Sequence, residues 1–122
     1  MADAIEIRLE IAAEPATVYR FLSDPERFRQ WMGAGATLGP ESITVGYPNG
    51  DIARGTIRER VENRRLVFGY GYENGANGLP VDASTVTIEL EPTREGTLLV
   101  FRHEGLDEAQ RRSHTIGWNY YL

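Results

Sequence analysis

The sequence predicts a single α+β domain in which an antiparallel sheet packs against a helix at the carboxyl end of the chain. Three observations lead to this class. Six segments alternate apolar and polar residues with the period of two that is typical of β-strands. Two short stretches after the first of these segments, and the stretch at residues 106–122, have helical spacing instead. The predicted order is therefore one strand, two helices, five strands and one helix.

Length and composition fit one intracellular domain. A chain of 122 residues can bury roughly two thirds of its unfolded surface, which is enough for one core. Cysteine is absent, which excludes disulfides and thiolate ligands and fits a reducing compartment. No apolar run is long enough to cross a bilayer, and the amino terminus shows no targeting signal. We therefore expect a cytoplasmic protein without a membrane span.

Charge and motif content exclude several classes of function. The net charge is −5 and the arginines are scattered, so the basic patch that binds nucleic acid is missing. Lysine is absent, which rules out Schiff-base chemistry. Motifs for serine hydrolysis, phosphate binding and dinucleotide binding are absent, and two histidines without an acidic cluster do not indicate a metal site. We expect no cofactor, no metal and no nucleic acid partner.

The first strand and the two helices after it are predicted from local patterns. Residues 5–11 alternate isoleucine or leucine with glutamate or arginine, as in a half-buried strand. Pro15 suits the first turn of a helix, and Asp24 followed by Pro25 is the start signal of a second helix. The apolar stripes of the two helices are Val18, Phe21 and Leu22 in the first and Phe28 and Trp31 in the second.

Five further strands are predicted after a loop. Residues 33–40 have neither period and indicate a loop or an irregular strand entry. The alternating segments are residues 42–47, 53–61, 66–72, 85–90 and 97–103. Asn49 and Gly50 between the first two segments predict a hairpin with a type I′ turn. In segment 97–103 both faces are mostly apolar, so the pattern does not settle which face points inward.

The last helix begins with a recognisable signal. Asp107 with Gln110 three residues later is a capping-box pattern. Helical spacing from there puts one set of residues on a single face: His114, Trp118, Tyr121 and Leu122. An isolated helix this short is not stable in water, so we expect its aromatic end to be buried against the sheet.

Five short motifs occur in the order found in a known family. They are DPERFRQW at 24–31, G-x-I-x-E at 55–59, RLVFGY at 65–70, EGTLLVFRHEGL at 95–106 and GW at 117–118. With the order of elements, they resemble the START-like (SRPBCC, helix-grip) superfamily and, within it, the group named after the activator of heat-shock protein 90 ATPase. The resemblance implies one START-like domain over residues 1–122. Its curved six-stranded sheet would wrap around the C-terminal helix, with a cavity between them closed at one end by two short helices.

The sequence departs from the pattern of this family in two places. Residues 42–50, SITVGYPNG, stand where the family has a second strand containing GG, so the resemblance does not define the cavity rim there. The family's last helix usually continues past GW, whereas this sequence stops four residues beyond Trp118. We therefore expect an apolar strip beyond Trp118, with either easy access for an apolar ligand or self-association as a homodimer through this end.

Candidate ligand-binding residues come from the strands and the last helix. The aromatic candidates are Trp31, Phe68, Tyr70, Trp118 and Tyr121, and the neighbouring strands add Val86, Ile88 and Phe101. Such residues either line a pocket for an apolar ligand or form plain core, and both interpretations are open. Only the cavity implied by the resemblance makes pocket lining as good an interpretation as packing.

Three polar candidates have two interpretations each. Glu59 falls on an otherwise apolar strand face, and one interpretation places His103 on the strand that faces it. The two side chains would serve as acid and base, or Glu59 would be tied to an arginine, which we prefer. His114 would present its imidazole to a ligand or, as we prefer, pack at the helix surface.

Three functional hypotheses follow. The leading one is binding of a hydrophobic or amphipathic small molecule between the sheet and the C-terminal helix, oriented by Glu59, His103 and tyrosine hydroxyls. The second, which the resemblance implies, is a co-chaperone-like regulator of a heat-shock protein 90 ATPase, with that chaperone as partner. The third is an enzyme of cyclase or hydratase type that uses Glu59 and His103.

Overall fold

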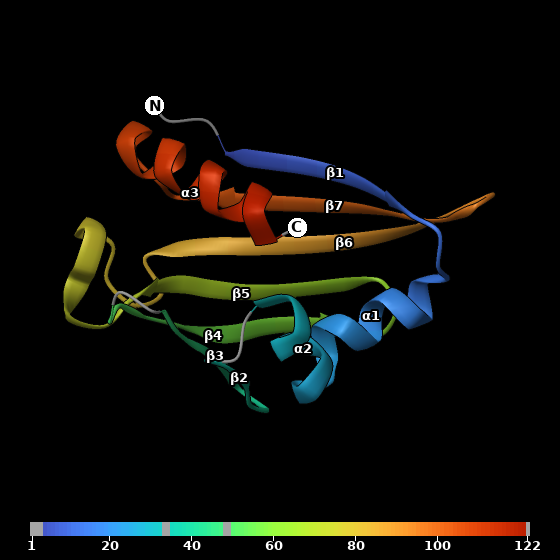
Figure 1. The fold of residues 1–122 in the computed structure, drawn as a ribbon, viewed down its shortest axis with the longest axis horizontal. Helices are drawn as coiled ribbons and strands as arrows, with labels where there is room; N and C mark the ends of the chain where they lie inside the picture. Colours follow the sequence, from blue (N-terminus) through green and yellow to red (C-terminus); the bar gives the residue numbers. More distant parts are fainter. Residues whose placement is uncertain (1–3, 33–34, 48–49, 122) are drawn as a thin grey trace.

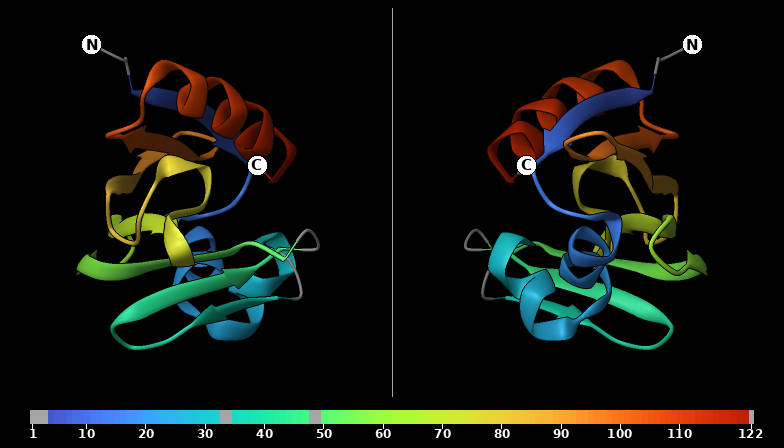
Figure 2. Two further views of the ribbon diagram at one scale, coloured as in Figure 1. Left: turned by 90° about the vertical axis from the view of Figure 1, so that its left-hand side faces the viewer. Right: turned by 90° about the vertical axis from the view of Figure 1, so that its right-hand side faces the viewer.

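Seven strands form one antiparallel sheet, and three helices lie on the same side of it (Figures 1 and 2). The computed structural model describes residues 4–32, 35–47 and 50–121, with the backbone alone for residues 74, 76, 77, 117 and 119–121. The strands are β1 (Ile5–Ile11), β2 (Ala36–Leu38), β3 (Ser42–Gly46), β4 (Ile52–Val61), β5 (Arg65–Tyr72), β6 (Ser84–Thr93) and β7 (Gly96–Glu104). The helices are α1 (Pro15–Ser23), α2 (Pro25–Met32) and α3 (Glu108–Tyr121), with a 3-10 helix η1 (Glu73–Gly78).

The α+β class with a C-terminal helix on an antiparallel sheet is confirmed, but the predicted number of six strands is wrong. The additional strand is β2, within the segment that was expected to be a loop or an irregular strand entry. It pairs with β3 through Ala36 opposite Val45 and Leu38 opposite Ile43. A strand of three residues is too short to show a period in the sequence, although Ala36 and Leu38 are buried and Thr37 is exposed, as alternation requires.

The order of strands in the sheet is β1-β7-β6-β5-β4-β3-β2. Neighbours along the chain are neighbours in the sheet, with one exception: β1 pairs with β7, near the other end of the chain. Helices α1 and α2 connect the two outermost strands, β1 and β2, and they cover one end of the sheet while α3 covers the other (Figure 1).

The helices begin where the sequence signals predict. Pro15 is the first residue of α1. The Asp24 carboxylate accepts a hydrogen bond from the backbone N–H of Glu26, 2.9 Å away, at the start of α2. At the start of α3, the Asp107 carboxylate accepts from the Gln110 N–H at 2.7 Å, and the Gln110 side-chain oxygen accepts from the Asp107 N–H at 2.9 Å. This reciprocal pair is the predicted capping box.

Strands β3 and β4 form the predicted hairpin, but its turn differs from the prediction. The Gly50 N–H donates to the Tyr47 carbonyl at 3.0 Å, so Gly50 closes the turn instead of occupying a central position. The predicted type I′ turn centred on Asn49 and Gly50 is therefore wrong, and Asn49 itself lies outside the described residues. Gly50 has a φ of 93°, a conformation that glycine adopts at little cost.

A β-bulge in β4 changes which side chains face the core. Ile57 pairs with Phe68, whereas Glu59 pairs with Val67, so the register with β5 shifts between Ile57 and Glu59. One additional residue in a strand turns the following side chains to the opposite face of the sheet. Glu59, which the uninterrupted alternation placed on the apolar face with Ile57, is consequently exposed.

The core lies between the concave face of the sheet and the helices. Strands β5, β6 and β7 contribute most of it: Leu66, Phe68, Tyr70, Val86, Ile88, Leu90, Leu99 and Phe101 are all buried. The ambiguity in β7 is resolved, because Leu99, Phe101 and His103 are buried while Leu98, Val100 and Arg102 are partly exposed. Helix α3 closes this core with Trp118, which is 3% exposed.

We predict that Gly55→Ala lowers the free energy of unfolding by about 2–3 kcal/mol. A Cβ atom at this position in β4 would coincide with the backbone carbonyl of Gly69 in β5, which cannot move without breaking the ladder. Gly46→Ala in β3 is the matched control, because its Cβ would meet nothing closer than the Gly35 carbonyl oxygen at 3.9 Å. Urea denaturation measures both variants, and equal midpoints would show that β4 and β5 do not approach so closely.

Candidate functional site

Helix α3 is held to the sheet by a cluster of rings, Tyr70, Tyr72, His103, His114 and Trp118, which we call the histidine-aromatic cluster. The Trp118 ring lies 5.6 Å from the Tyr70 ring and 5.9 Å from the His103 ring, measured between centroids. The two imidazoles are 5.5 Å apart and nearly perpendicular. Strands β5 and β7 supply three members and α3 supplies the other two, so the cluster joins three elements.

His103 is fixed in one neutral form by its hydrogen bonds. The Trp118 indole N–H, which can only donate, lies 3.0 Å from His103 Nδ1, so Nδ1 is the acceptor. His103 Nε2 therefore carries the proton and donates to Ser84 Oγ at 2.7 Å. Ser84 in turn donates to the Tyr70 carbonyl at 2.7 Å. Both ring nitrogens of His103 are occupied, so this histidine has no free position for a ligand.

His114 ends a second chain of hydrogen bonds that runs in one direction. Its Nδ1 lies 2.8 Å from the Gln110 carbonyl, which can only accept, so Nδ1 carries the proton. His114 Nε2 then accepts from the Tyr72 hydroxyl at 2.7 Å. The Tyr72 hydroxyl is 3.5 Å from that of Tyr70, and the Tyr70 hydroxyl is 2.7 Å from that of Tyr47. Because the Tyr72 hydroxyl donates to His114, the Tyr70 hydroxyl donates to Tyr72 and the Tyr47 hydroxyl donates to Tyr70.

Both histidines are neutral at pH 7. Burial, and to a smaller extent the neighbouring His114, lowers the pKa of His103 to about 3. Burial also lowers the pKa of His114, although the hydrogen bond to the Gln110 backbone opposes the shift. Burial is the main cause that raises the pKa of the Tyr70 hydroxyl well above its usual value. The cluster therefore has no charged member at neutral pH.

Glu59 and His103 are not brought together. The Glu59 carboxylate is on the outer face of the sheet, 3.4 Å from the Arg65 Nε, and Arg65 also contacts Glu89 at 3.3 Å. The partners of His103 are Ser84 and Trp118. The acid-base pair considered from the sequence is therefore wrong, because the bulge in β4 turns Glu59 outward. The observed partner of Glu59 is an arginine, which was the preferred alternative.

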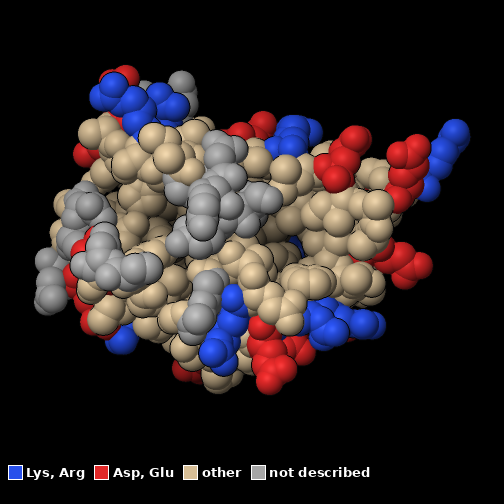
Figure 3. Space-filling view, in the orientation of Figure 1, with Lys and Arg blue, Asp and Glu red and all other residues tan. Residues whose placement is uncertain are grey.

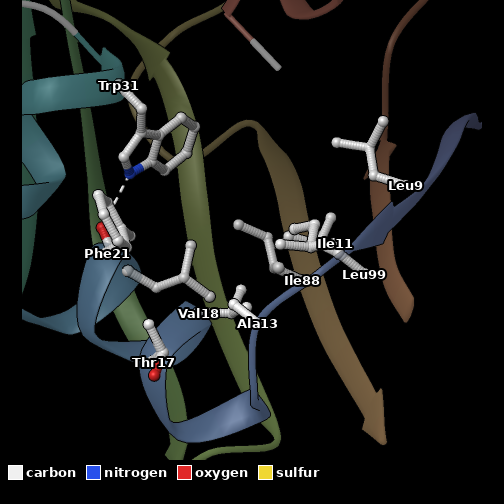
Figure 4. A pocket seen from close by; sticks show the side chains of 10 residues that line it. Leu9, Ile11, Ala13, Thr17, Val18, Phe21, Trp31, Ile88 and Leu99 are labelled. Carbon is white, nitrogen blue, oxygen red and sulfur yellow. Dashed lines mark hydrogen bonds between the residues drawn. The ribbon is translucent and has the colours of Figure 1, made fainter. Parts of the chain in front are cut away.

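An open pocket lies beside the cluster, between α1 and α2 on one side and β1, β6 and β7 on the other. Its volume is about 190 Å³. The lining residues are Leu9, Ile11, Ala13, Thr17, Val18, Phe21, Leu22, Trp31, Ile88 and Leu99. Figure 4 shows Trp31 and Phe21 on the helical side, with Leu9, Ile11 and Leu99 across the space from them.

The lining of this pocket is almost without hydrogen-bonding groups. The Trp31 indole N–H donates to the Phe21 carbonyl at 2.8 Å, so it is already used. The Trp31 ring is further held edge to face by the buried Phe28 ring, 5.4 Å away. Thr17 supplies the one side-chain hydroxyl of the lining. No lining residue is ionisable, so the pocket can hold an apolar group but offers no acid, base or nucleophile apart from this hydroxyl.

Apart from Glu59, which is exposed on the outer face of the sheet, the predicted site residues whose side chains are described separate into two groups. Trp31 and Ile88 line the pocket. The members of the other group are at most 9% exposed and pack in the core: Phe68, Tyr70, Val86, Phe101, His103, His114 and Trp118. The side chain of Tyr121 lies outside the described part of the structure, so the prediction for it, and for the apolar strip beyond Trp118, stays a prediction.

Sequence reasoning missed most of the pocket. Val18, Phe21 and Leu22 were identified as the apolar stripe of the first helix, and Leu9 and Ile11 as apolar residues of the half-buried first strand, but none of the five was predicted to line a site. Their periodicity was the available signal. It cannot distinguish a side chain that touches a neighbour from one that borders a space.

The described residues form neither a membrane-spanning helix nor a metal-binding group. None of the helices they form is both long and apolar enough to cross a membrane. They also contain no group of three or more His, Cys, Asp or Glu side chains arranged to hold a metal ion.

We predict that Trp118→Ala lowers the free energy of unfolding by about 3–5 kcal/mol, because a buried indole is lost from the core. Trp118→Phe should cost less, about 1–3 kcal/mol, because a ring remains but His103 Nδ1 loses its donor in a buried site. Urea denaturation gives both values. Melting of either variant within a degree or two of the wild type would show that α3 is not held by this residue.

Stability should fall as the pH is lowered below about 6.5. The pKa of His103 is 6.5 in an unfolded chain and about 3 in the folded protein, so between these values only the unfolded state binds the proton. The free energy of unfolding then decreases by up to about 1.4 kcal/mol per pH unit, and the lowered pKa of His114 acts in the same direction.

Denaturant titrations between pH 7.5 and 5 measure this slope. His103→Asn provides the comparison, since the amide oxygen can still accept from Trp118 but the side chain does not titrate. This variant should be less stable at pH 7.5 and should show a shallower slope. Parallel curves for the two proteins would assign the pH dependence to other groups.

Comparison with solved structures shows the same fold in three proteins of low sequence identity. Protein MLL2253 from Mesorhizobium loti is 20% identical, with a TM-score of 0.84, and the match covers 98% of this chain and 90% of that one. The Aha1 dimer from Colwellia psychrerythraea is 18% identical with a TM-score of 0.81, covering 99% and 91%. PFC0360w, an HSP90 activator from Plasmodium falciparum, is 17% identical with a TM-score of 0.78, covering 98% and 90%.

The family of the chain is shown by its sequence. A search of curated proteins gives no match. Residues 12–122 match the family described as "Activator of Hsp90 ATPase homolog 1-like protein", which is nearly the whole chain. The resemblance inferred from the short motifs is therefore confirmed, and the chain belongs to the family of activator of Hsp90 ATPase homolog 1-like proteins.

Proposed function

We propose that this protein binds a small apolar molecule, or the apolar part of an amphipathic one, in the pocket between α1, α2 and strands β1, β6 and β7. The observation that carries the proposal is an open space of about 190 Å³ with an almost entirely apolar lining. Ligand pockets are mostly apolar and contain a few polar groups for orientation. Here Thr17 is the one such group on a side chain of the lining.

The open form of the pocket bears on how a ligand would enter. Its lining is almost entirely apolar and one side is open, so the apolar part of a ligand would be held inside and the remainder of a larger ligand would lie outside. An amphipathic molecule would therefore enter with its apolar end first.

The location differs from the one expected from the sequence, which was the contact between the sheet and the last helix. Near Trp118 that contact is filled by the histidine-aromatic cluster, whose members satisfy one another. A ligand there would have to displace rings that are buried and hydrogen bonded. The apolar pocket needs no such rearrangement.

Fluorescence of Trp31 tests the proposal. The chain has two tryptophans, so Trp118→Phe leaves Trp31, in the pocket wall, as the single reporter. Titration with the neutral apolar probe N-phenyl-1-naphthylamine should quench Trp31 emission with saturation. Ala13→Phe in the same background fills the pocket and should weaken probe binding at least about tenfold.

Ala12→Phe is the matched control. Ala12 is exposed and does not belong to the lining, so the same substitution there should leave probe binding within about twofold. Circular dichroism establishes that both variants are folded. Equal loss of binding in the two variants, or no saturable quenching at all, would refute the proposed site.

A co-chaperone role is the second candidate, and the observation that favours it is membership of a family described by activation of an Hsp90 ATPase. The test is the ATPase rate of Hsp90 from the same source with and without this protein. Ala13→Phe should leave any stimulation unchanged, because the pocket is not needed for that role. Stimulation that disappears with Ala13→Phe would connect the two candidates.

A further inference from the structure

Strand β1 is a regular strand at the edge of the sheet. It is the first strand in the sheet order, so β7 is its single strand neighbour among the described residues. Its register with β7 is continuous from Ile5 to Ile11, without a bulge, and the segment contains neither proline nor glycine. Alternate backbone N–H and C=O groups therefore point along the free edge with no strand to pair with. The opposite edge of the sheet, β2, is only three residues long.

Apolar surface remains exposed at this edge. Ile7, Leu9 and Ile11 on the concave face are only half-buried, whereas Leu99 and Phe101, to which β1 pairs, are fully buried. Figure 1 shows β1 along the upper border of the sheet, with α3 in front of part of its length and no strand beyond it. A strand added at this border would cover the remaining apolar surface.

The outer face of β1 carries the charges Glu6, Arg8 and Glu10 in alternation with the apolar residues. Acidic and basic side chains both lie along this border in Figure 3. Glu6 is already paired within its own chain, 3.4 Å from Arg8 and 3.2 Å from Arg102. Glu10 has no ion-pair partner among the described residues, and the Arg8 side chain is 60% exposed.

We propose that a second copy of this chain docks on β1, with the two β1 strands antiparallel and related by a two-fold axis at Leu9. Leu9 is then opposite Leu9 of the second copy, and Arg8 is opposite Glu10 of the second copy, in both directions. Ile7 lies opposite Ile11 of the second copy on the concave face. Every cross-strand pair between Ile7 and Ile11 is thus apolar with apolar or acidic with basic, and the two sheets form one continuous sheet.

The charges favour this register over two alternative registers. An axis at Arg8 would place Arg8 opposite Arg8 and Glu6 opposite Glu10, which are repulsive pairs. An axis at Ile7 would pair Arg8 with Glu6, which already has Arg102 as a partner, and would leave Glu10 unpaired. An axis at Leu9 gives Glu10 its partner and uses the three half-buried apolar residues. This inference is independent of ligand binding, although Leu9 and Ile11 also belong to the pocket wall.

Sedimentation equilibrium over a wide concentration range tests the proposal, and a reversible monomer-dimer equilibrium is expected. Arg8→Glu places two glutamates opposite each other at both ion pairs and should raise the dissociation constant at least about tenfold. The exchange Arg8→Glu with Glu10→Arg restores opposite charges at this register and should recover most of the affinity. Both positions are exposed, so circular dichroism should show folded variants.

Disulfide trapping tests the register directly, because the chain contains no cysteine. Leu9→Cys places the two thiols opposite each other across the axis, where antiparallel pairs have Cα atoms about 4.5–5.5 Å apart, within the range of a disulfide. Mild oxidation should link this variant into dimers, and Ile7→Cys should link much more slowly. A strict monomer, a dimer unaffected by Arg8→Glu, or faster trapping through Ile7→Cys would overturn the proposal.

Discussion

The position of α3 depends on one hydrogen bond, from the Trp118 indole to His103 Nδ1. This bond fixes the protonation of His103, which fixes the direction of its second bond to Ser84, and Ser84 is tied to the backbone of β5. Helix α3 is thus connected to β7, β6 and β5 through hydrogen-bonding groups whose protons each have one consistent position. Burial makes an error in any of them costly, so the network specifies one docked position for the helix.

The same network explains why the cluster and the pocket have different characters. The cluster is closed, polar at its centre and internally satisfied, while the pocket beside it is open and apolar. Membership of the activator family does not assign a function by itself, since one fold supports many activities. Under the proposed function, the ligand occupies the space bordered by α1 and Trp31, and the cluster is the support that holds the sheet and α3 together beside it.

Local signals predicted the parts of the fold that local chemistry determines. The capping box of Asp107 and Gln110, the proline at the start of α1 and the cap at Asp24 each depend on residues within one helical turn, and each formed as expected. The bulge that turns Glu59 outward was not predictable from local sequence, because no proline or glycine lies between Ile57 and Glu59, where the register shifts. It arises from the pairing between β4 and β5. Strand β2 is too short to carry a period.

The site was harder to predict than the fold, because its position depends on how distant elements meet. Tyr70, Phe101 and Trp118 were among the predicted aromatic residues and their rings do meet, but whether such rings enclose a space depends on side-chain packing that a one-dimensional pattern does not contain. The pocket lies where residues 9–31, which include α1 and part of β1, meet Ile88 of β6 and Leu99 of β7 from much later in the chain.

The pairing of β1 with β7 also has a consequence during synthesis. The partner of Ile5 is His103, so β1 cannot join the sheet until nearly the whole chain has been made. At roughly 5–20 residues per second, the first strand waits on the order of 5 to 20 s after it leaves the ribosome, with both of its edges unpaired. Its alternating glutamates and arginine are then the features that keep an otherwise β-prone segment soluble until translation supplies its partner.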